Sequence, residues 1–488
     1  MGLSPHEYRD LLSTALSHAV DSDTIEPDVR TLFTPTTHRR ALDPDATVVQ
    51  GGRGVGKTVW FKALQDDALR RLAAEEYHLT RLNAIEPRAG YGTELVPGKY
   101  PSQRTLGHLV TRFQHTEDIW TAVVLHSFGY AETSRLADWS DRVQWVLDNP
   151  EPVERALAKA DEEAGARGFT VLFLFDALDR LHSRRDIADR LVGGILKVAL
   201  DLRTRTRNLR AKVFIRHDMF DSVKLNFPDA SKLTANAADL TWSPTSLYGL
   251  LFHQLGNSGT PLSEMFIEST RSTGQWNRNP LRNTPARSLI ADHEEQRKLF
   301  ADIAGPYMGK DHRKGITYTW LPNHLTDGLG QVSPRSFLSA LTTATEVTRE
   351  KYHAHATALH WDGIRQGVQT ASGIRVTEIR EDIPWVSTAI EPLAGLQVPI
   401  EQAEVIQRWT ERDLRDELDR LSESTAQNDA EKMAAPTGPL TTDYSALIGE
   451  LIELGVMSRR ANGKLDLPDV YRIAFDLGRK GGVPRIRP

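Results

Sequence analysis

The sequence contains no cysteine among its 488 residues. This absence excludes disulfide bonds, thiolate zinc sites, iron–sulfur clusters and a cysteine nucleophile. Long apolar runs are missing too, since the densest, Val171 to Phe175, is far shorter than the roughly 20 residues of a membrane-spanning helix. The N-terminus has no apolar signal-peptide segment, so we expect a cytoplasmic protein with no membrane partner.

An excess of charge of one sign is also absent. The 60 basic and 65 acidic side chains give a formal net charge of −5, which argues against a general nucleic-acid coat but allows a local basic surface. At about 100–200 residues per domain, the length predicts two to four domains.

The N-terminal half alternates short strand patterns with helical patterns. Strands are expected at 47–50, 78–82, 170–175 and 212–215, and the run at 170–175 is typical of a strand buried on both faces of a parallel sheet. This alternation predicts an α/β fold with right-handed crossovers. Residues 86–103 are rich in glycine and proline and predict a long loop.

A glycine-rich turn follows the first strand and fits the P-loop pattern G-x-x-x-x-G-K-[ST]. Glycines let backbone N–H groups surround phosphates, Lys57 can reach the β- and γ-phosphates, and the Thr58 hydroxyl can bind Mg²⁺. A helical pattern continues from Thr58 to about residue 74. The residues predicted to bind ATP are Gly51, Gly52, Arg53, Gly54, Val55, Gly56, Lys57 and Thr58.

Phosphoryl transfer also needs a carboxylate near the metal, and the strand at 170–175 ends in Asp176. We therefore predict Asp176 as a second Mg²⁺ ligand, acting directly or through water. Many hydrolases of this type have a glutamate next, but this chain has Ala177, and the nearest acid is Asp179. Asp179 is predicted either as a second catalytic acid or as a helix N-cap.

The run Asp-Ala-Leu-Asp-Arg at 176–180 resembles the D-G-x-D-E signature of NACHT ATPases and, more closely, the D-D-x-D-R signature of KAP ATPases. Both belong to the additional-strand P-loop ATPases, which include the STAND switches and the AAA+ class. The resemblance implies that Asp176 is the metal-ligand acid and Asp179 the second acid. Ala177 and Arg180 depart from the patterns, which predicts slow hydrolysis.

Two arginines lie where these families place sensors of the γ-phosphate. Arg216 ends the strand at 212–215, and Arg335 opens a helix in a segment similar to the G-x-x-R lid helix of AAA+ and origin-recognition ATPases. The resemblance implies a catalytic role for both. The residues alone also fit an ordinary surface arginine at a strand end and at a helix N-terminus.

The C-terminal end predicts a winged helix: a helix at 443–454, a strand, an Asn-Gly turn at 462–463 and a second strand. Such modules bind DNA or dock proteins, and the wing would carry Arg459, Arg460 and Lys464. A second basic stretch, Arg203 to Arg216, has six cations and no acid. It predicts a solvated face, an arginine finger acting on a neighbouring subunit, or a nucleic-acid contact.

The expected fold class is α/β, with a P-loop NTPase core and parallel sheet followed by a helical lid and a C-terminal winged helix. The expected segments are an N-terminal helical segment (1–35), the P-loop ATPase core (36–255), the helical lid with Arg335 (256–352), a helical region with a linker (353–435), and the winged-helix-like domain with its basic tail (436–488).

By resemblance, the chain is an ATP-binding and hydrolysing regulatory switch of a bacterial anti-phage defence or conflict system. We expect ATP and Mg²⁺ as cofactors, self-association controlled by nucleotide, and a separate effector protein. Two alternatives stay open: a DNA-engaging ATPase of the origin-recognition or transposition-helper type, and a nucleotide-binding scaffold that does not hydrolyse.

Overall fold

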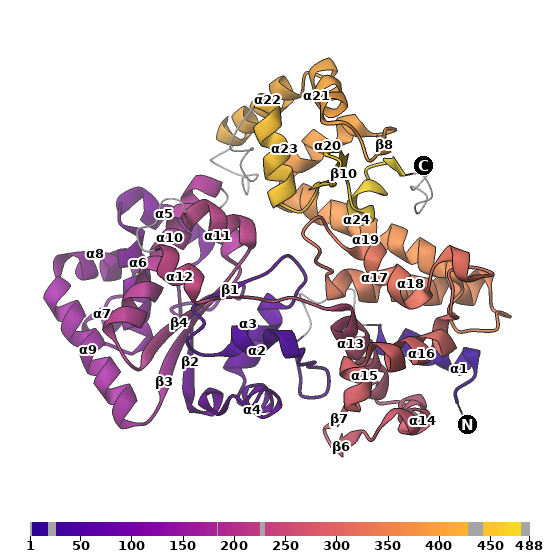
Figure 1. The fold of residues 1–488 in the computed structure, drawn as a ribbon. Helices are drawn as coiled ribbons and strands as arrows, with labels where there is room; N and C mark the ends of the chain where they lie inside the picture. The colour runs from indigo at the N-terminus through magenta and orange to yellow at the C-terminus, as the bar shows by residue number, and fades with distance from the viewer. Residues whose placement is uncertain (1, 18–25, 183, 225–229, 428–442, 480–488) are drawn as a thin grey trace. The chain divides into compact units, whose positions relative to one another are not determined.

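The computed structural model describes residues 2–17, 26–182, 184–224, 230–427 and 443–479. The chain forms two compact units, one spanning Thr36–Leu240 and the other formed by the residues up to Pro35 with those from Thr241 onward (Figure 1). We call them the P-loop unit and the helical unit. Within the described ranges, no helix is both long enough and apolar enough to cross a membrane.

A five-stranded sheet forms the centre of the P-loop unit, and all its neighbouring strands are parallel. The order β2-β3-β4-β1-β5 places β4 between β1 and β3. The predicted α/β fold class is thereby confirmed. The strands are β1 (Val48–Gln50), β2 (Ile85–Tyr91), β3 (Thr170–Phe175), β4 (Leu209–Ile215) and β5 (Ala237–Asp239).

The direction of the chain across this sheet determines where the helices lie. The chain crosses from β1 to the far edge at β2 and then returns, so right-handed crossovers place the first helices on one face and the later ones on the other. The first are α3 (Lys57–Gln65) and α4 (Asp67–Glu76), preceded by α2 (Arg39–Leu42) (Figure 1). The later ones are α5 (Gln103–Arg112), α6 (Thr116–Ser127), α7 (Ala131–Ser134), α8 (Trp139–Asp148), α9 (Pro150–Ala166), α10 (Arg185–Arg205), α11 (His217–Lys224) and α12 (Ala230–Ala235).

Alternate residues of β3 pack against the helices of the second face. The ring of Phe175 meets Trp120 of α6 edge-on with centroids 5.8 Å apart, and Phe173 meets Phe128 in the same way at 5.4 Å. The Trp120 indole N–H donates to the Leu191 carbonyl of α10 at 2.9 Å. Aromatic pairs of this geometry add about 0.5–1.5 kcal/mol to area burial, so β3 is held firmly just before Asp176.

The second strand differs from the prediction. Residues 80–84 form a 3-10 helix, and the strand is β2, in the stretch that glycine and proline content predicted to be a loop. Pro87 is tolerated because β2 lies at the edge of the sheet. Gly90 is required by packing, since a Cβ there would lie 2.4 Å from the Phe175 ring.

The helix predicted after the P-loop is two helices. It breaks at Asp66, whose carboxylate accepts a hydrogen bond from the Leu69 backbone N–H at 2.9 Å and so caps α4.

The helical unit contains the segments predicted as lid and winged helix. The core includes α1 (Pro5–Ala15), α13 (Pro244–Gly256), α16 (His293–Ala304), α17 (Thr317–Leu325), α18 (Pro334–Lys351) and α19 (Trp361–Asp382). Its other elements are α14 (Pro261–Ser269), α15 (Arg287–Ala291), α20 (Pro384–Ile390), α21 (Gln402–Glu411), α22 (Leu414–Gln427), β6 (Asn277–Asn279), β7 (Arg282–Thr284), β8 (Gln397–Val398) and β11 (Gly478–Arg479).

The predicted tail of a winged helix is present in the described part of the C-terminal region. α23 (Tyr444–Glu453) begins at the Asp443 cap, and β9 (Ser458–Arg459) pairs with β10 (Leu465–Asp466) across the Asn-Gly turn. Gly463 has φ 82°, as that turn requires. α24 (Asp469–Arg472) follows. Most of the predicted linker and the basic tail beyond Arg479 lie outside the described residues.

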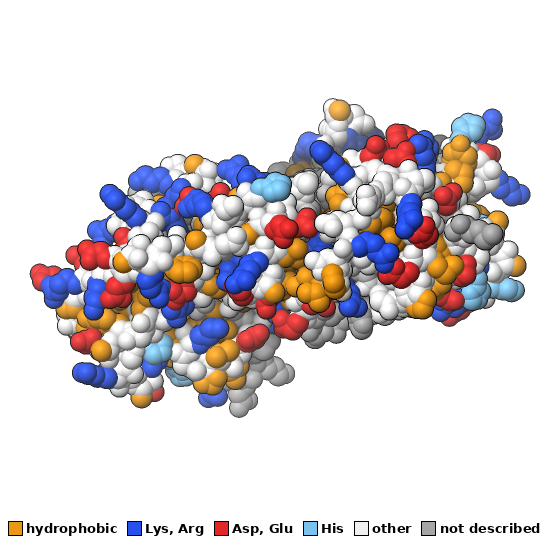
Figure 2. All heavy atoms as spheres, turned by 90° about the horizontal axis from the view of Figure 1, so that it is seen from below, with side chains coloured by type: hydrophobic (Ala, Val, Ile, Leu, Met, Phe, Trp, Pro, Cys, Tyr) orange, Lys and Arg blue, Asp and Glu red, His pale blue; other side chains and the backbone are white. Residues whose placement is uncertain are grey.

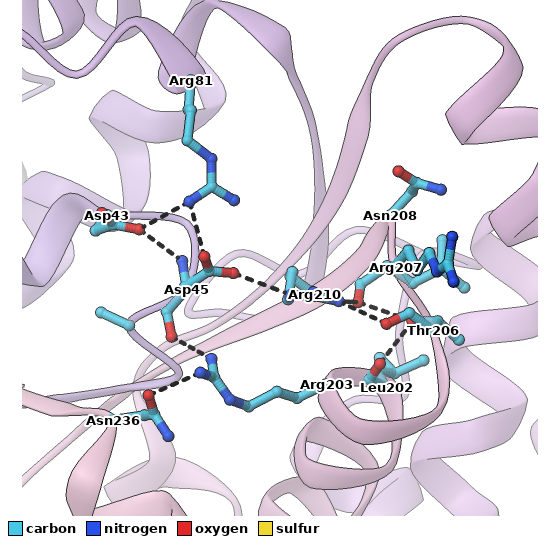
Figure 3. A network of polar contacts seen from close by, with 12 residues as sticks. Asp43, Asp45, Arg81, Leu202, Arg203, Thr206, Arg207, Asn208, Arg210 and Asn236 are labelled. Carbon is cyan, nitrogen blue, oxygen red and sulfur yellow. Dashed lines mark hydrogen bonds and ion pairs between the residues drawn. The ribbon is translucent and has the colours of Figure 1, made fainter.

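Arg203 and Arg210 of the basic stretch both contact Asp45, in the segment that leads into β1 (Figure 3). Arg210 donates to the Asp45 carboxylate at 3.1 Å, and Arg203 donates to the Asn236 side chain at 2.7 Å. Lys212 is fully buried, and its ammonium donates to the carbonyls of Ala41, Asp43 and Ala46 at 2.7–2.9 Å. These cations therefore hold the approach to the P-loop in place.

We predict that Lys212→Met lowers the free energy of unfolding by about 3 kcal/mol or more, because three buried carbonyls lose their donor. Urea unfolding measures the loss, and Lys197→Met, which removes an exposed partner of Glu117, should cost under about 1 kcal/mol. Equal losses would contradict the role given to Lys212.

The difference in the free energy of unfolding between the wild type and Lys212→Met should grow as the pH rises. Burial lowers the pKa of Lys212 to about 7, whereas an unfolded lysine titrates near 10. Between these values the unfolded chain binds more protons, so the stability of the wild type rises with pH. Its advantage over Lys212→Met should therefore widen from pH 7 to pH 10.

Candidate nucleotide-binding site

The P-loop joins the end of β1 to the start of α3. Its first amide, Gly51 N–H, donates to the Ile215 carbonyl at the end of β4 at 3.1 Å. A Cβ on Gly51 would lie 2.6 Å from the Val55 side chain, and Gly56 has φ 105° immediately before the helix. These positions require glycine, so the loop turns tightly and α3 begins at Lys57 with its N-terminal amides directed at the loop.

The predicted phosphate-binding lysine lies over this loop. The Lys57 ammonium donates to the carbonyls of Gly51 and Gly52 at 2.8 and 2.7 Å. Burial lowers the pKa of Lys57 to about 8. The negative charge of Asp176 works to raise this pKa, and the positive charge of Arg216 works to lower it further. Lys57 therefore lies in the electrostatic reach of both the predicted metal acid and the predicted sensor arginine.

Asp176 ends β3, and its side chain is directed into the interior. The residue is 2% exposed, and its Oδ2 atom is buried without a hydrogen-bond partner among the described residues. Burial raises the pKa of Asp176, against the influence of the Thr58 hydroxyl and the Lys57 ammonium. A buried carboxylate oxygen without a donor suits a cation, so the two predicted metal ligands, Thr58 and Asp176, fit Mg²⁺.

Magnesium prefers oxygen ligands and usually keeps several waters and phosphate oxygens. Two protein oxygens, those of Thr58 and Asp176, are therefore enough of a protein contribution to such a site. When bound, the ion would neutralise phosphate charge.

Asp179 lies three residues beyond Asp176, in a 3-10 helix over Leu178–Arg180. Its side chain is exposed and caps no helix, because the cap position of this helix is Ala177 and that of α10 is Arg184. The alternative prediction of a helix N-cap is therefore wrong. Asp179 lies near enough to Lys57 to influence its pKa.

Arg216 follows β4 directly, between the P-loop and the strand that carries Asp176. Its guanidinium donates to the Asp218 carboxylate at 3.0 Å, and Arg185 of α10 donates to the same carboxylate at 3.1 Å. Burial works to raise the pKa of Asp218, but the two guanidiniums hold it at about 2. Asp218 is therefore a permanent anion that fixes the direction of Arg216.

Sequence reasoning missed Asp218, Arg185 and Tyr91. Tyr91 accepts the Asp176 backbone N–H at 3.1 Å and donates its hydroxyl to the Arg180 carbonyl at 3.1 Å, which orders the segment after β3. Asp218 could have been found from the sequence, because it is an acid two residues after the predicted sensor arginine Arg216. Arg185 and Tyr91 gave no local signal, because their contacts are distant in sequence.

Arg335 belongs to the helical unit, at the start of α18. Its guanidinium donates to Glu378 Oε1 of α19 at 2.9 Å, and Arg375 donates to Glu378 Oε2 at 3.2 Å. All three side chains are only 11–15% exposed. The other four predicted catalytic residues lie in the P-loop unit.

The wing cations are also engaged within their own unit. Arg460 contacts Asp466 at 2.6 Å, Lys464 contacts Glu401 at 2.9 Å, and Arg459 donates to Gln402 at 2.8 Å. The charges of Arg460 and Lys464 are thus compensated by carboxylates, whereas Arg459 is held by the neutral Gln402 side chain.

No protein-family model matches the sequence, and no curated protein matches it. Among solved structures, the chain is similar to the ORC2 protein of Aeropyrum pernix in its ADPNP–ADP complexes, with 13% identity, coverage of 93% of this chain and 94% of that one, and a TM-score of 0.40. The ADP form of that protein is 12% identical, covers 93% of this chain and 93% of its own, and has a TM-score of 0.33. Cdc6p of Pyrobaculum aerophilum is 11% identical, with coverage of 93% of this chain and 94% of that one and a TM-score of 0.31.

Ala177 is a non-glycine residue in the left-handed region, with φ 57° and ψ 41°. Such a conformation costs roughly 1–2 kcal/mol. We therefore predict that Ala177→Gly raises the free energy of unfolding by about 1 kcal/mol, measured by urea unfolding. The matched control Ala158→Gly, at an exposed position inside α9, should lower it by about 1 kcal/mol. Destabilisation by both would show that Ala177 carries no such strain.

Proposed function

We propose that this chain binds Mg²⁺–ATP at the P-loop and hydrolyses it slowly, as a regulatory switch. The observation that carries the proposal is that three groups lie at the ends of the neighbouring strands β1, β4 and β3. They are the P-loop, the guanidinium of Arg216, which Asp218 orients, and the Oδ2 atom of Asp176, which has no hydrogen-bond partner among the described residues. Ligands of open parallel sheets bind at this edge, beyond the carboxyl ends of the strands.

Each group has a distinct task in this proposal. The loop amides and Lys57 hold the β- and γ-phosphates, Thr58 and Asp176 hold the metal, and Arg216 faces the charge that develops on the γ-phosphate. Asp179 would orient the attacking water. Because Ala177 replaces a second acid next to Asp176, hydrolysis is slow and the bound state is long-lived.

The finer assignment rests on the motif resemblance. We infer a switch of a bacterial anti-phage or conflict system, in which ATP controls self-association and contact with a separate effector protein. A slow ATPase suits such a role, since the output is the lifetime of a conformation rather than the number of turnovers.

We predict that Lys57→Ala abolishes the rise in melting temperature that Mg²⁺–ATP causes, because backbone amides alone cannot offset the phosphate charge. Asp176→Asn should retain some ATP stabilisation but lose its dependence on Mg²⁺. The matched control Lys62→Ala, on the same helix α3, should behave as wild type. An unchanged ATP-induced shift in Lys57→Ala would contradict the P-loop assignment.

A second prediction concerns Arg335, which we propose to read the γ-phosphate. ATP would then compete with Glu378 for the guanidinium, and a charge-assisted contact of about 1.5–3 kcal/mol is enough to shift a two-state population tenfold. Mg²⁺–ATP should therefore protect residues 333–341 from hydrogen exchange more than ADP does.

Arg335→Ala should remove this difference while leaving ADP affinity nearly unchanged. Arg349→Ala, which removes an exposed cation of the same helix paired with Asp10, is the matched control and should keep the difference. Equal protection by the two nucleotides in the wild type would refute the sensor role.

A further inference from the structure

A short hairpin projects between α16 and α17 of the helical unit. Tyr307 pairs with Ile316 in an antiparallel bridge, the Met308 N–H donates to the Gly315 carbonyl at 2.9 Å, and the Thr317 N–H donates to the Pro306 carbonyl at 3.1 Å. Met308 is buried in the core of the unit. The hairpin is therefore anchored at its base rather than attached loosely to the surface.

Glycines give the hairpin its shape. Gly309 and Gly315 have φ values of 154° and 95°, which other residues rarely adopt. A Cβ on Gly309 would also lie 2.9 Å from the Lys314 side chain. The positions of the tip residues are thus determined by the backbone.

The tip, Lys310 to Lys314, is strongly basic. Lys310, Arg313 and Lys314 are exposed, and among the described residues none of them has an ion-pair partner. The sole acid of the tip, Asp311, accepts the Arg313 backbone N–H at 2.9 Å and caps the 3-10 turn at 312–314. The three exposed cations therefore lie within five consecutive residues of the chain.

This arrangement differs from the other basic regions. Four cations of the earlier basic stretch and the wing residues contact groups of their own unit: Arg203, Arg210, Lys212 and Arg216 of the stretch, with Arg459, Arg460 and Lys464 of the wing. The face shown in Figure 2 has basic and acidic side chains interspersed. A local cluster of uncompensated cations on a protein of net charge −5 is suited to close contact with a polyanion rather than to long-range attraction.

The position of the apolar side chains favours nucleic acid over a membrane. Tyr307 and Ile316 are 37% and 38% exposed, and they lie at the base of the hairpin. The five tip residues are all polar or charged, so nothing at the tip would enter a lipid bilayer. A cationic tip beside an exposed aromatic ring matches phosphates and bases of a nucleic acid strand.

We propose that the hairpin from Pro306 to Thr317 is a nucleic-acid contact that binds phosphates through Lys310, Arg313 and Lys314, with Tyr307 placed beside the adjoining nucleotide. The contact is a property of the helical unit and does not depend on the P-loop. The Lys57→Ala variant is therefore expected to bind nucleic acid as the wild type does, which separates this proposal from the nucleotide site.

The test compares the affinity of the full chain for fluorescent single-stranded and duplex DNA of the same length over a series of salt concentrations. The combined variant Lys310→Gln, Arg313→Gln and Lys314→Gln should bind at least one form about tenfold or more weakly at low salt. Its slope of log affinity against log salt should be shallower by roughly 2–3, because up to three phosphate contacts are lost.

The control variant carries Arg71→Gln, Arg155→Gln and Lys159→Gln, three exposed cations with acidic partners on their own helices. It has the same net charge as the hairpin variant, so it should keep wild-type affinity and slope. Both variants should show the wild-type melting temperature. A larger loss of single-stranded than of duplex binding in Tyr307→Ala would support stacking by the ring.

Equal losses in the two triple variants, or none in either, would overturn the proposal. A third outcome would also overturn the proposal. If the wild type binds vesicles containing phosphatidylserine, and the hairpin variant loses this binding while its DNA binding is unchanged, the hairpin contacts a lipid surface instead.

Discussion

The insertion of β4 between β1 and β3 is the constraint on which the site depends. Because β4 pairs with both neighbours, the P-loop after β1, Asp176 after β3 and Arg216 after β4 leave the sheet side by side. The bond from Gly51 N–H to the Ile215 carbonyl joins the P-loop directly to this strand. The charged groups that we propose to bind a phosphate and its metal thus come from three strand ends that lie far apart in sequence.

The need to compensate buried charge explains the contacts that the cations on and beside β4 make within the P-loop unit. Burying a cation is expensive unless it is hydrogen-bonded or paired, and the basic residues of β4 and the adjoining Arg216 satisfy this rule in different ways. Lys212 binds carbonyls of the segment before β1, Arg210 binds Asp45, and Arg216 binds Asp218. The strand therefore fixes the segment that leads to the P-loop, and it ends just before the candidate sensor Arg216.

Local patterns predicted the parts of the site that depend on short stretches of sequence. The glycine spacing of the P-loop and the apolar run ending in Asp176 are such stretches, and the fold class followed from their alternation with helices. β2 was not predictable, because Pro87 and Gly90 indicate a loop until the edge position of the strand and the Phe175 ring are known. Likewise, Arg203, Arg210 and Lys212 bind groups more than 150 residues away in sequence, so a charge run that reads as a solvated face holds an internal segment in place.

The central claim is that Thr58 and Asp176 share a magnesium ion with ATP held by the P-loop. Calorimetric titration of the wild-type chain with ATP, in the presence of Mg²⁺ and then of a chelator, tests it most directly. The account predicts one ATP bound per chain and a clear loss of affinity when the metal is removed. Absence of ATP binding, or binding equally strong without Mg²⁺, would contradict it.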